Sequence, residues 1–515
     1  MLSRRHFIAG ATASLVAAPA ILRAQSIWRD YPFSLGVAAG DPAADGFVIW
    51  TRLAPRPLDP HGGMAMAPMP VKWQVATEPR FDTVVREGEA LARPELGHSV
   101  HVELEGLEPD RPYWYRFEAG GERSINGQAR TLPRTGAAPE ALRFGVAGCQ
   151  NYEAGFYTAY RHLAEEELAF VYHYGDYIYE YRGDAIRPGW SGDLIVAARQ
   201  GVGQDAFDLA DYRQRYALYK SDPDLQRAHA AFAFFHTFDD HEVTNNWVQD
   251  IDPDGAPPEL FRTRRAMALQ AWYENLPVRR TMMPRFGATS AHRQVRYGDL
   301  AEIDLLDTRQ YRSDQPCGDG FRPVCAEVTS ADAQVLGAEQ EAWLARNLSR
   351  SQARWNCLAQ QVMMMSVDRR RTPDEAPEKL LNLDTWAAYE VPRQRLLARL
   401  RGLDNVVVLT GDEHQNWAGE LHDDRDRRVA VEFVATSISS GGDGSDLRPG
   451  SDHILAANPQ LKFLNDQRGY LTCDVGRDEW RTNFMVVDRV STPGGALSKR
   501  ATWAVARGET TLRQA

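Results

Sequence analysis

The chain has 515 residues, which is longer than a single hydrophobic core usually grows, and its 43% hydrophobic and 25% charged residues are typical of a globular protein. Its formal net charge of -11 argues against a general nucleic-acid binder, because affinity for polyphosphate backbones comes from clustered Lys and Arg. We therefore expect a large domain with a smaller one. A small phosphorylated substrate is compatible with this charge if metal ions reverse the local negative field.

The amino terminus, residues 1–25, has the pattern of an export signal. Arg4 and Arg5 precede a mildly apolar stretch from Ile8 to Leu22, with small residues around its end. The paired arginines resemble a twin-arginine signal, which serves proteins exported in a folded state; an ordinary secretory signal is the alternative. The stretch is shorter than the roughly 20 apolar residues that cross a bilayer. We predict a periplasmic or secreted protein that uses the twin-arginine export machinery and keeps no transmembrane anchor after signal removal.

Residues 26–134 are predicted to form a small β-sandwich. Short strand-like runs separated by turns extend from Phe47 to Thr131, with no long helical period. The segment LEGLEPDRPYWYRFEAGG resembles a fibronectin type III repeat, in which Leu107, Pro109 and Tyr113 would form a tyrosine corner. This resemblance concerns a scaffold and indicates no activity.

A linker rich in Pro, Gly and Ala follows, and from residue 140 to residue 510 the pattern changes. Apolar strand-like runs such as LRFGVAGCQ, AFVYHYGD and NVVVLTGDEH alternate with helical stretches such as FYTAYRHLAEEEL. This alternation predicts a layered α/β domain, whose ligands gather beyond the carboxyl ends of the strands. The fold class expected for the whole chain is therefore α/β, with the small fibronectin-III-like sandwich in front.

The five cysteines leave at least one unpaired. Cys317 and Cys325 flank GDGFRPV in a predicted loop, and we expect them to form a disulfide in an oxidising compartment. Cys357 and Cys473 lie in apolar strand-like runs, where a buried thiol acting as a small hydrophobic group is the better interpretation. Cys149 is left over.

Residue types that bind metals stand just after several of the predicted strands. They are Cys149, Asp176, Tyr179, Asp239, Asp240, His241, Glu242, Asn245, Asn246, Asp412 and His414. Each alone has an ordinary structural interpretation, as a turn or cap residue, a buried thiol, a solvated acidic turn or a structural histidine. Their occurrence in four separate strand-end loops favours one shared site. Crowded carboxylates raise one another's pKa, and bound cations would resolve that conflict.

The ligand types indicate which metals to expect. Thiolate and phenolate are poor ligands for magnesium or calcium, whereas phenolate is an axial ligand to ferric iron in haem proteins. Carboxylate and amide oxygens suit hard cations of the calcium class. We therefore predict a ferric ion bound by Cys149, Asp176 and Tyr179. Harder divalent ions would be held by Asp176, Asp240, Asn245 and Asp412, so that Asp176 bridges two metals.

Such a site predicts hydrolysis of phosphate esters. Adjacent metals clamp the attacking and leaving oxygens of an in-line displacement and lower the pKa of a shared water. His241 is a candidate to protonate the leaving alkoxide or to stabilise the equatorial oxygens. His414 is a candidate metal ligand or outer donor, and together with Asp240 these histidines form the predicted catalytic set.

Seven blocks of sequence, spread in order over essentially the whole chain, carry a resemblance to a known family. They are FSLGVAAGDP from Phe33, GCQNYEAGF from Gly148, GDYIYE from Gly175, FDDHEVTNNW from Phe238, LDTRQYR from Leu306, QQVMM from Gln360 and GDEHQNW from Gly411. With these blocks the chain resembles the alkaline phosphatase D (PhoD) family of exported metallophosphoesterases, which are similar to purple acid phosphatases.

The resemblance implies a metallophosphatase-type β-sandwich flanked by helices, with one ferric ion and two calcium ions as cofactors. It places Cys149, Asp176, Tyr179 and Asp412 on the iron side. Around calcium or the phosphate it places Asp176, Asp240, His414 and one of Asn245 and Asn246. The implied activity is alkaline hydrolysis of phosphate monoesters and diesters by a metal-activated water or hydroxide.

Three alternatives stay open at this point. The first is a phospholipase D-like phosphodiesterase that acts on phospholipids or cell-wall polymers. The second is a glycoside hydrolase that uses paired carboxylates such as Asp239 and Glu242, although this leaves Cys149 and Tyr179 without a purpose. The third is a non-catalytic binding protein on the same scaffold, which predicts gaps in the ligand set.

Overall fold

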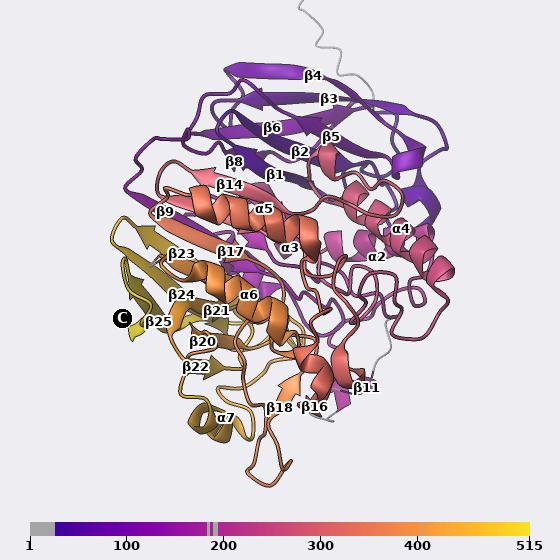
Figure 1. The fold of residues 1–515 in the computed structure, drawn as a ribbon. Helices are drawn as coiled ribbons and strands as arrows, with labels where there is room; N and C mark the ends of the chain where they lie inside the picture. Colours follow the sequence, from indigo (N-terminus) through magenta and orange to yellow (C-terminus); the bar gives the residue numbers. More distant parts are fainter. Residues whose placement is uncertain (1–25, 183–185, 189–193, 404) are drawn as a thin grey trace, which may run out of the picture.

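The structure is a computed structural model that describes residues 26–182, 186–188, 194–403 and 405–515. Two β-sheets pack face to face, helices cover the outer face of each sheet, and a further sheet lies at one end of the molecule (Figure 1). The predicted export signal, residues 1–25, lies outside the described residues. Within them, no helix is both long enough and apolar enough to cross a membrane.

The larger sheet has four parallel strands in its middle, β9, β10, β13 and β1. Its strands, in spatial order, are β26 (Arg513–Gln514), β25 (Leu497–Ala506), β24 (Glu479–Val487), β23 (Gly469–Gly476), β9 (Ala141–Ala147), β10 (Val171–His173), β13 (Ala233–His236), β1 (Val37–Ala43), β2 (Gly46–Arg52) and β5 (Ser99–Glu103). Strand β10 pairs in parallel with β9 on one side and with β13 on the other. These three strands consequently end at the same edge of the sheet.

The second sheet also has a parallel centre, formed by β15, β17, β19 and β21. Its strands, in spatial order, are β14 (Arg293–Tyr297), β15 (Ala301–Leu305), β17 (Trp355–Ala359), β19 (Val406–Thr410), β21 (Arg428–Val434), β20 (Asn416–His422) and β22 (Leu461–Asn465). Strands β17 and β19 are buried along their whole length, as parallel strands covered on both faces usually are. Between the sheets, Trp355 of β17 contacts Trp480 of β24 with ring centroids 5.9 Å apart.

Helices shield the outer face of each sheet from solvent. The larger sheet packs against α1 (Thr158–Leu163), α2 (Leu209–Lys220), α3 (Pro223–Ala231) and α4 (Pro258–Asn275). The second sheet packs against α5 (Gly337–Arg350) and α6 (Glu390–Leu400), which lie across its strands in Figure 1. The predicted layered α/β fold is therefore confirmed.

The amino-terminal sandwich is present, but one of its sheets is shared with the rest of the chain. Strands β4 (Val84–Ala92), β3 (Met69–Ala76), β6 (Pro112–Ala119), β7 (Glu122–Arg123) and β8 (Gly127–Arg130) face β1, β2 and β5 across a common core. The Tyr113 hydroxyl accepts a hydrogen bond from the Glu108 backbone N–H at 2.9 Å, as in a tyrosine corner. Strand β1 pairs in parallel with β13, so the hydrogen bonding of the larger sheet joins residues 26–134 to residues 140–510. The division of the chain into these two domains stays a prediction.

The remaining elements are short. They are β11 (Ile186–Pro188) with β12 (Leu194–Val196), β16 (Phe321–Pro323) with β18 (Leu380–Asn382), α7 (Ser451–Ala457), and the 3-10 helices Pro60–Gly63, Pro94–Leu96, Arg280–Met282, Pro316–Gly318, Ala326–Thr329 and Trp386–Ala388. The predicted disulfide between Cys317 and Cys325 is confirmed. Cys357 and Cys473 are free and buried, also as predicted, and Cys149 is free and buried as well.

Candidate functional site

Four loops that follow parallel strands carry the predicted site residues. Cys149 follows β9, Asp176 follows β10, and Asp240 follows β13 at the same edge of the larger sheet. Asp412 follows β19 of the second sheet. Ligand atoms from Asp239, Asp240 and Asp412 lie within 4.8 Å of one another, so the loops from the two sheets meet.

The backbone at these positions has an uncommon conformation. Cys149, Asp176, Asp412 and His414 have positive φ angles of 50°, 52°, 66° and 52°. The left-handed region costs a residue with a Cβ roughly 1–2 kcal/mol, so it persists only where the surroundings enforce it, and such residues cluster at functional sites. The packing around these loops therefore holds their backbone in this conformation.

The side chain of Tyr174 packs against the glycines that precede Cys149 and Asp412. It is fully buried, and its hydroxyl donates a hydrogen bond to the Thr436 carbonyl at 3.0 Å. A Cβ added at Gly148 would lie 2.4 Å from the Tyr174 ring, and one added at Gly411 would lie 2.1 Å from it. Only glycine fits at these two positions, so the loops of Cys149 and Asp412 close tightly over the same ring.

One part of the site gathers around the phenol of Tyr179. Its hydroxyl donates to Asp176 Oδ2 at 2.9 Å, and it lies 3.1 Å from His414 Nε2. The Cys149 Sγ lies 3.3 Å from the same oxygen of Asp176, and the Ser440 hydroxyl donates to Tyr179 at 2.7 Å. The chain thus returns three residues after Asp176 to the same point in space.

The second part of the site is a group of carboxylates with one imidazole. Asp176, Asp240 and His241 each offer a ligand atom within 4.8 Å of the others. Because Asp176 and Asp240 each belong to two such groups, the two parts of the site are continuous. Seven of the eight predicted site residues therefore have their side chains in this cluster, and Asn245 does not. The seven are His241, Asp240, His414, Cys149, Asp176, Tyr179 and Asp412, and Asp239 joins them.

The two asparagines lie beside this cluster in different environments. The Asn245 side chain is exposed, and its backbone N–H donates to Glu180 Oε1 at 2.8 Å. The Asn246 backbone N–H donates to Asp240 Oδ2 at 2.7 Å, while its side-chain amide donates to Asp319 at 2.7 Å. The assignment of Asn245 as a ligand stays a prediction.

Comparison with known proteins decides the family. A family model described as PhoD-like phosphatase matches residues 144–484, and the model of the family's N-terminal domain matches residues 17–133. Alkaline phosphatase D of Bacillus subtilis (strain 168) is 43% identical over 527 residues, covering 99% of this chain and 89% of that protein. The chain belongs to the PhoD-like phosphatase family.

One solved structure supports the family assignment, and a second is similar in fold. The structure of PhoD superposes with a TM-score of 0.90 at 44% identity and covers 95% of this chain and 92% of that one. The purple acid phosphatase PPD1 from yellow lupin (Lupinus luteus) seeds has a TM-score of 0.51 at 10% identity, covering 93% and 75% of the two chains, which shows likeness of fold alone. This PhoD-like phosphatase is a phosphoric ester hydrolase.

Two buried glutamates organise the site of this phosphatase in ways that sequence reasoning missed. Glu242, fully buried, accepts the backbone N–H groups of Asp176, Tyr177 and Asp239 at 3.2, 2.6 and 2.9 Å and so ties two site loops together. Glu180 accepts from His241 Nδ1 at 2.7 Å. The block GDYIYE had marked the position of Glu180, but its partner 61 residues away was not visible in the sequence.

Arg309, from the block LDTRQYR, supplies a buried positive charge that sequence reasoning also missed. Its Nε donates to Asp239 Oδ1 at 2.5 Å, and its other nitrogens contact Asp384 at 2.8 and 3.0 Å. Asp239 Oδ1 is bound to Arg309, and Glu242 accepts three backbone N–H groups, so both carboxylates have structural partners that the glycosidase interpretation does not explain. The glycoside hydrolase alternative is not supported.

The phosphatase site holds more negative charge than its own cations compensate. Burial raises the pKa of Asp176 and Asp412 well above the ordinary range, and neighbouring carboxylates add to the effect. Burial likewise raises the pKa of the Cys149 thiol, with the charges of Asp176 and Asp412 adding to it. Burial opposes ionisation of Asp240 too, but His241 and Arg309 hold its pKa below the ordinary value.

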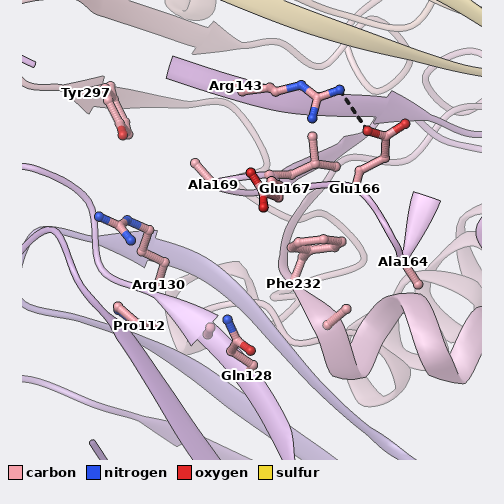
Figure 2. A pocket seen from close by; sticks show the side chains of 13 residues that line it. Pro112, Gln128, Arg130, Arg143, Ala164, Glu166, Glu167, Ala169, Phe232 and Tyr297 are labelled. Carbon is pink, nitrogen blue, oxygen red and sulfur yellow. Dashed lines mark hydrogen bonds and ion pairs between the residues drawn. The ribbon is translucent and has the colours of Figure 1, made fainter. Parts of the chain in front are cut away.

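A separate cavity of about 470 Å³ lies at the opposite ends of the central strands, beside the amino-terminal sandwich (Figure 2). Ala169, just before β10, and Phe232, just before β13, line it. Its Arg143 is paired with Glu166 at 2.7 Å, and its Arg130 with Asp110 at 2.8 Å. Both arginines are thus engaged, so the carboxyl-end cluster is the better candidate for the phosphatase site.

Proposed function

We propose that the chain is an exported, metal-dependent alkaline phosphatase and phosphodiesterase whose active centre is the cluster of Cys149, Asp176, Tyr179, Asp240 and Asp412. The family and the fold support hydrolysis of phosphate esters. The residue pattern of the first 25 positions supports export by the twin-arginine route. The metals, the preference between monoesters and diesters, and the ligand roles are part of the proposal.

The observation that carries the metal dependence is a pair of carboxylate oxygens. Asp176 Oδ1 and Asp239 Oδ2 are buried, and among the described residues neither has a hydrogen-bond partner. A buried charged oxygen without a partner costs several kcal/mol, by the order of magnitude of desolvation penalties. Bound cations would remove that cost, and they would also compensate the excess of carboxylates around Asp240.

The chemistry of the donors fits iron and calcium. The thiol of Cys149 and the phenol of Tyr179 suit a ferric ion together with Asp176 and Asp412. The carboxylates of Asp176, Asp240 and Asp412 suit calcium, and Asn245 is the proposed amide ligand. When bound, such ions polarise the phosphoryl group and lower the pKa of a water, which makes it a nucleophile at alkaline pH.

The side chains around the cluster position the substrate and handle protons. Asp412 and His414 are partly exposed, and Asn245 is exposed, so the phosphate ester enters from this side. In the displacement, the oxygen of a water bonds to phosphorus and releases one proton to solvent, while the bond from phosphorus to the leaving oxygen breaks. His241 gives its Nε2 proton to that leaving oxygen and regains a proton from solvent. Asp240 would hold a divalent ion, and His414 would bind the phosphoryl group.

Metal analysis of the purified protein, combined with rates on p-nitrophenyl phosphate and bis(p-nitrophenyl) phosphate, tests the proposal. We expect iron and calcium in the protein, a visible charge-transfer band, and turnover of both esters at alkaline pH. Chelation of calcium is expected to abolish turnover while the protein stays folded, and added calcium to restore it. Colourless protein without iron would reject the ferric assignment, and absence of turnover on both esters by the metal-loaded protein would reject the activity.

A further inference from the structure

Three consecutive residues of the chain hold the ring of His241. Tyr179 packs against one side of the imidazole with ring centroids 4.1 Å apart, and Tyr181 contacts it edge-on at 5.3 Å. Between them, Glu180 Oε2 lies 2.7 Å from Nδ1 of His241. These contacts restrict both the tilt and the rotation of the ring.

We propose that Glu180 is a positioning residue that fixes the orientation of the His241 ring. The contact of 2.7 Å between Glu180 Oε2 and Nδ1 engages this ring nitrogen on the side away from the substrate. That leaves Nε2 as the ring nitrogen available to the substrate. The inference rests on the proposed function, in which Nε2 of His241 protonates the leaving oxygen.

The two oxygens of Glu180 have separate tasks, which makes the proposal testable. Oε2 contacts the imidazole, whereas Oε1 accepts the backbone N–H of Asn245 at 2.8 Å and the hydroxyl of Thr244 at 3.3 Å. Glu180 is 2% exposed and His241 is 7% exposed, so water competes little for these contacts. A change at Thr244 therefore tests how Glu180 holds the loop of residues 244–245, whereas a change at His241 tests how Glu180 orients the imidazole.

Glu180 also has a geometric consequence for the rest of the site. Its neighbour Tyr179 donates to Asp176 and lies beside His414, so one short segment sets both the phenol and the imidazole. If the ring of His241 turned over, Nδ1 would face the cluster and the nitrogen that faces the substrate would change. A carboxylate at position 180 makes that arrangement unfavourable, because Nδ1 would lose its acceptor.

The experiment compares Glu180→Gln with Thr244→Val as the matched control, each on p-nitrophenyl phosphate and on phenyl phosphate. The poorer phenolate leaving group needs the proton more. We expect Glu180→Gln to lower kcat on phenyl phosphate about 10- to 100-fold, the usual effect of losing an outer partner of a site residue. The loss on p-nitrophenyl phosphate is expected to be clearly smaller, with little change of KM. Thr244→Val is expected to lower both rates equally and only slightly.

His241→Ala and the double variant His241→Ala with Glu180→Gln complete a double-mutant cycle. The cycle compares the effect of Glu180→Gln on the rate in the presence and in the absence of the His241 imidazole, so a general loss of stability in Glu180→Gln would show in both. We expect the double variant to be no slower than His241→Ala alone, because Glu180 acts through the ring. Additive losses, equal losses on the two leaving groups, or a Thr244→Val effect as large as that of Glu180→Gln would overturn the inference. If His241→Ala keeps the full rate on phenyl phosphate, the proposed role of His241 fails first, and the role of Glu180 with it.

Discussion

Replacing Arg309 with Met tests how much this buried cation stabilises the folded protein through its ion pairs with Asp239 and Asp384. Arg309 is fully buried and contacts both Asp239 and Asp384. Methionine keeps an unbranched apolar side chain but removes the charge. Asp384 would keep its contacts with Arg312 and Gln315, whereas Asp239 would lose its cation.

The expected size of the effect follows from these contacts. Removing one partner of a buried ion pair costs about 3–5 kcal/mol, because the other charge stays buried without compensation. The entropy of unfolding is about 2.1 cal/mol/K per residue, so the 515-residue chain has roughly 1.1 kcal/mol/K if it unfolds as one unit. The melting temperature is therefore expected to fall by about 3–5 °C.

Differential scanning calorimetry at one metal concentration measures this shift, with Arg312→Met as the control. Arg312 contacts Asp384 but not Asp239, and Asp384 would keep Arg309 in that variant. We expect the control to melt closer to the wild-type protein. A melting temperature of Arg309→Met within about 1 °C of wild type, or a control that loses as much, would refute the reasoning, since about 1 °C corresponds to only about 1 kcal/mol here.

The remaining predictions concern the site and the response to acid. Cys149→Ala and Asp176→Asn are each expected to lose turnover of both nitrophenyl esters by orders of magnitude, with lowered iron content; near-normal turnover in either variant would remove that residue from the proposed site. Burial lowers the pKa of His101 to about 4 despite its contacts with the Tyr273 and Leu276 carbonyls. The unfolded chain binds this proton near pH 6.5, so stability is full above that pH and falls by about 3 kcal/mol down to pH 4. His101→Gln is expected to show a flatter dependence of melting temperature on pH over this interval, and an unchanged slope would contradict the assignment.

Much of the site could be predicted because its residues are polar positions directly after apolar strands. Parallel strands end at a common edge, so Cys149, Asp176 and Asp240 were bound to come close together once the strands were recognised. Tyr179 followed from its distance of three residues from Asp176, and the disulfide followed from the short loop between its cysteines. These features are set by local pattern, which a sequence states directly.

Partners that lie far apart in the chain were decided by the tertiary structure alone. Glu242 reads as one more acidic residue of DDHE, yet it accepts three backbone N–H groups, which have no signature in a sequence. The pairing of β1 with β13 joins residues 39 and 233, and the Glu180 contact joins residues 180 and 241. The sequence alone determined which chemical groups stand at the strand ends, because strand patterns are local. Only the packing of the sheets decided which of those side chains gather in the candidate metal cluster and which form hydrogen bonds or ion pairs with other residues. Those contacts depend on distances between segments that lie far apart in the chain.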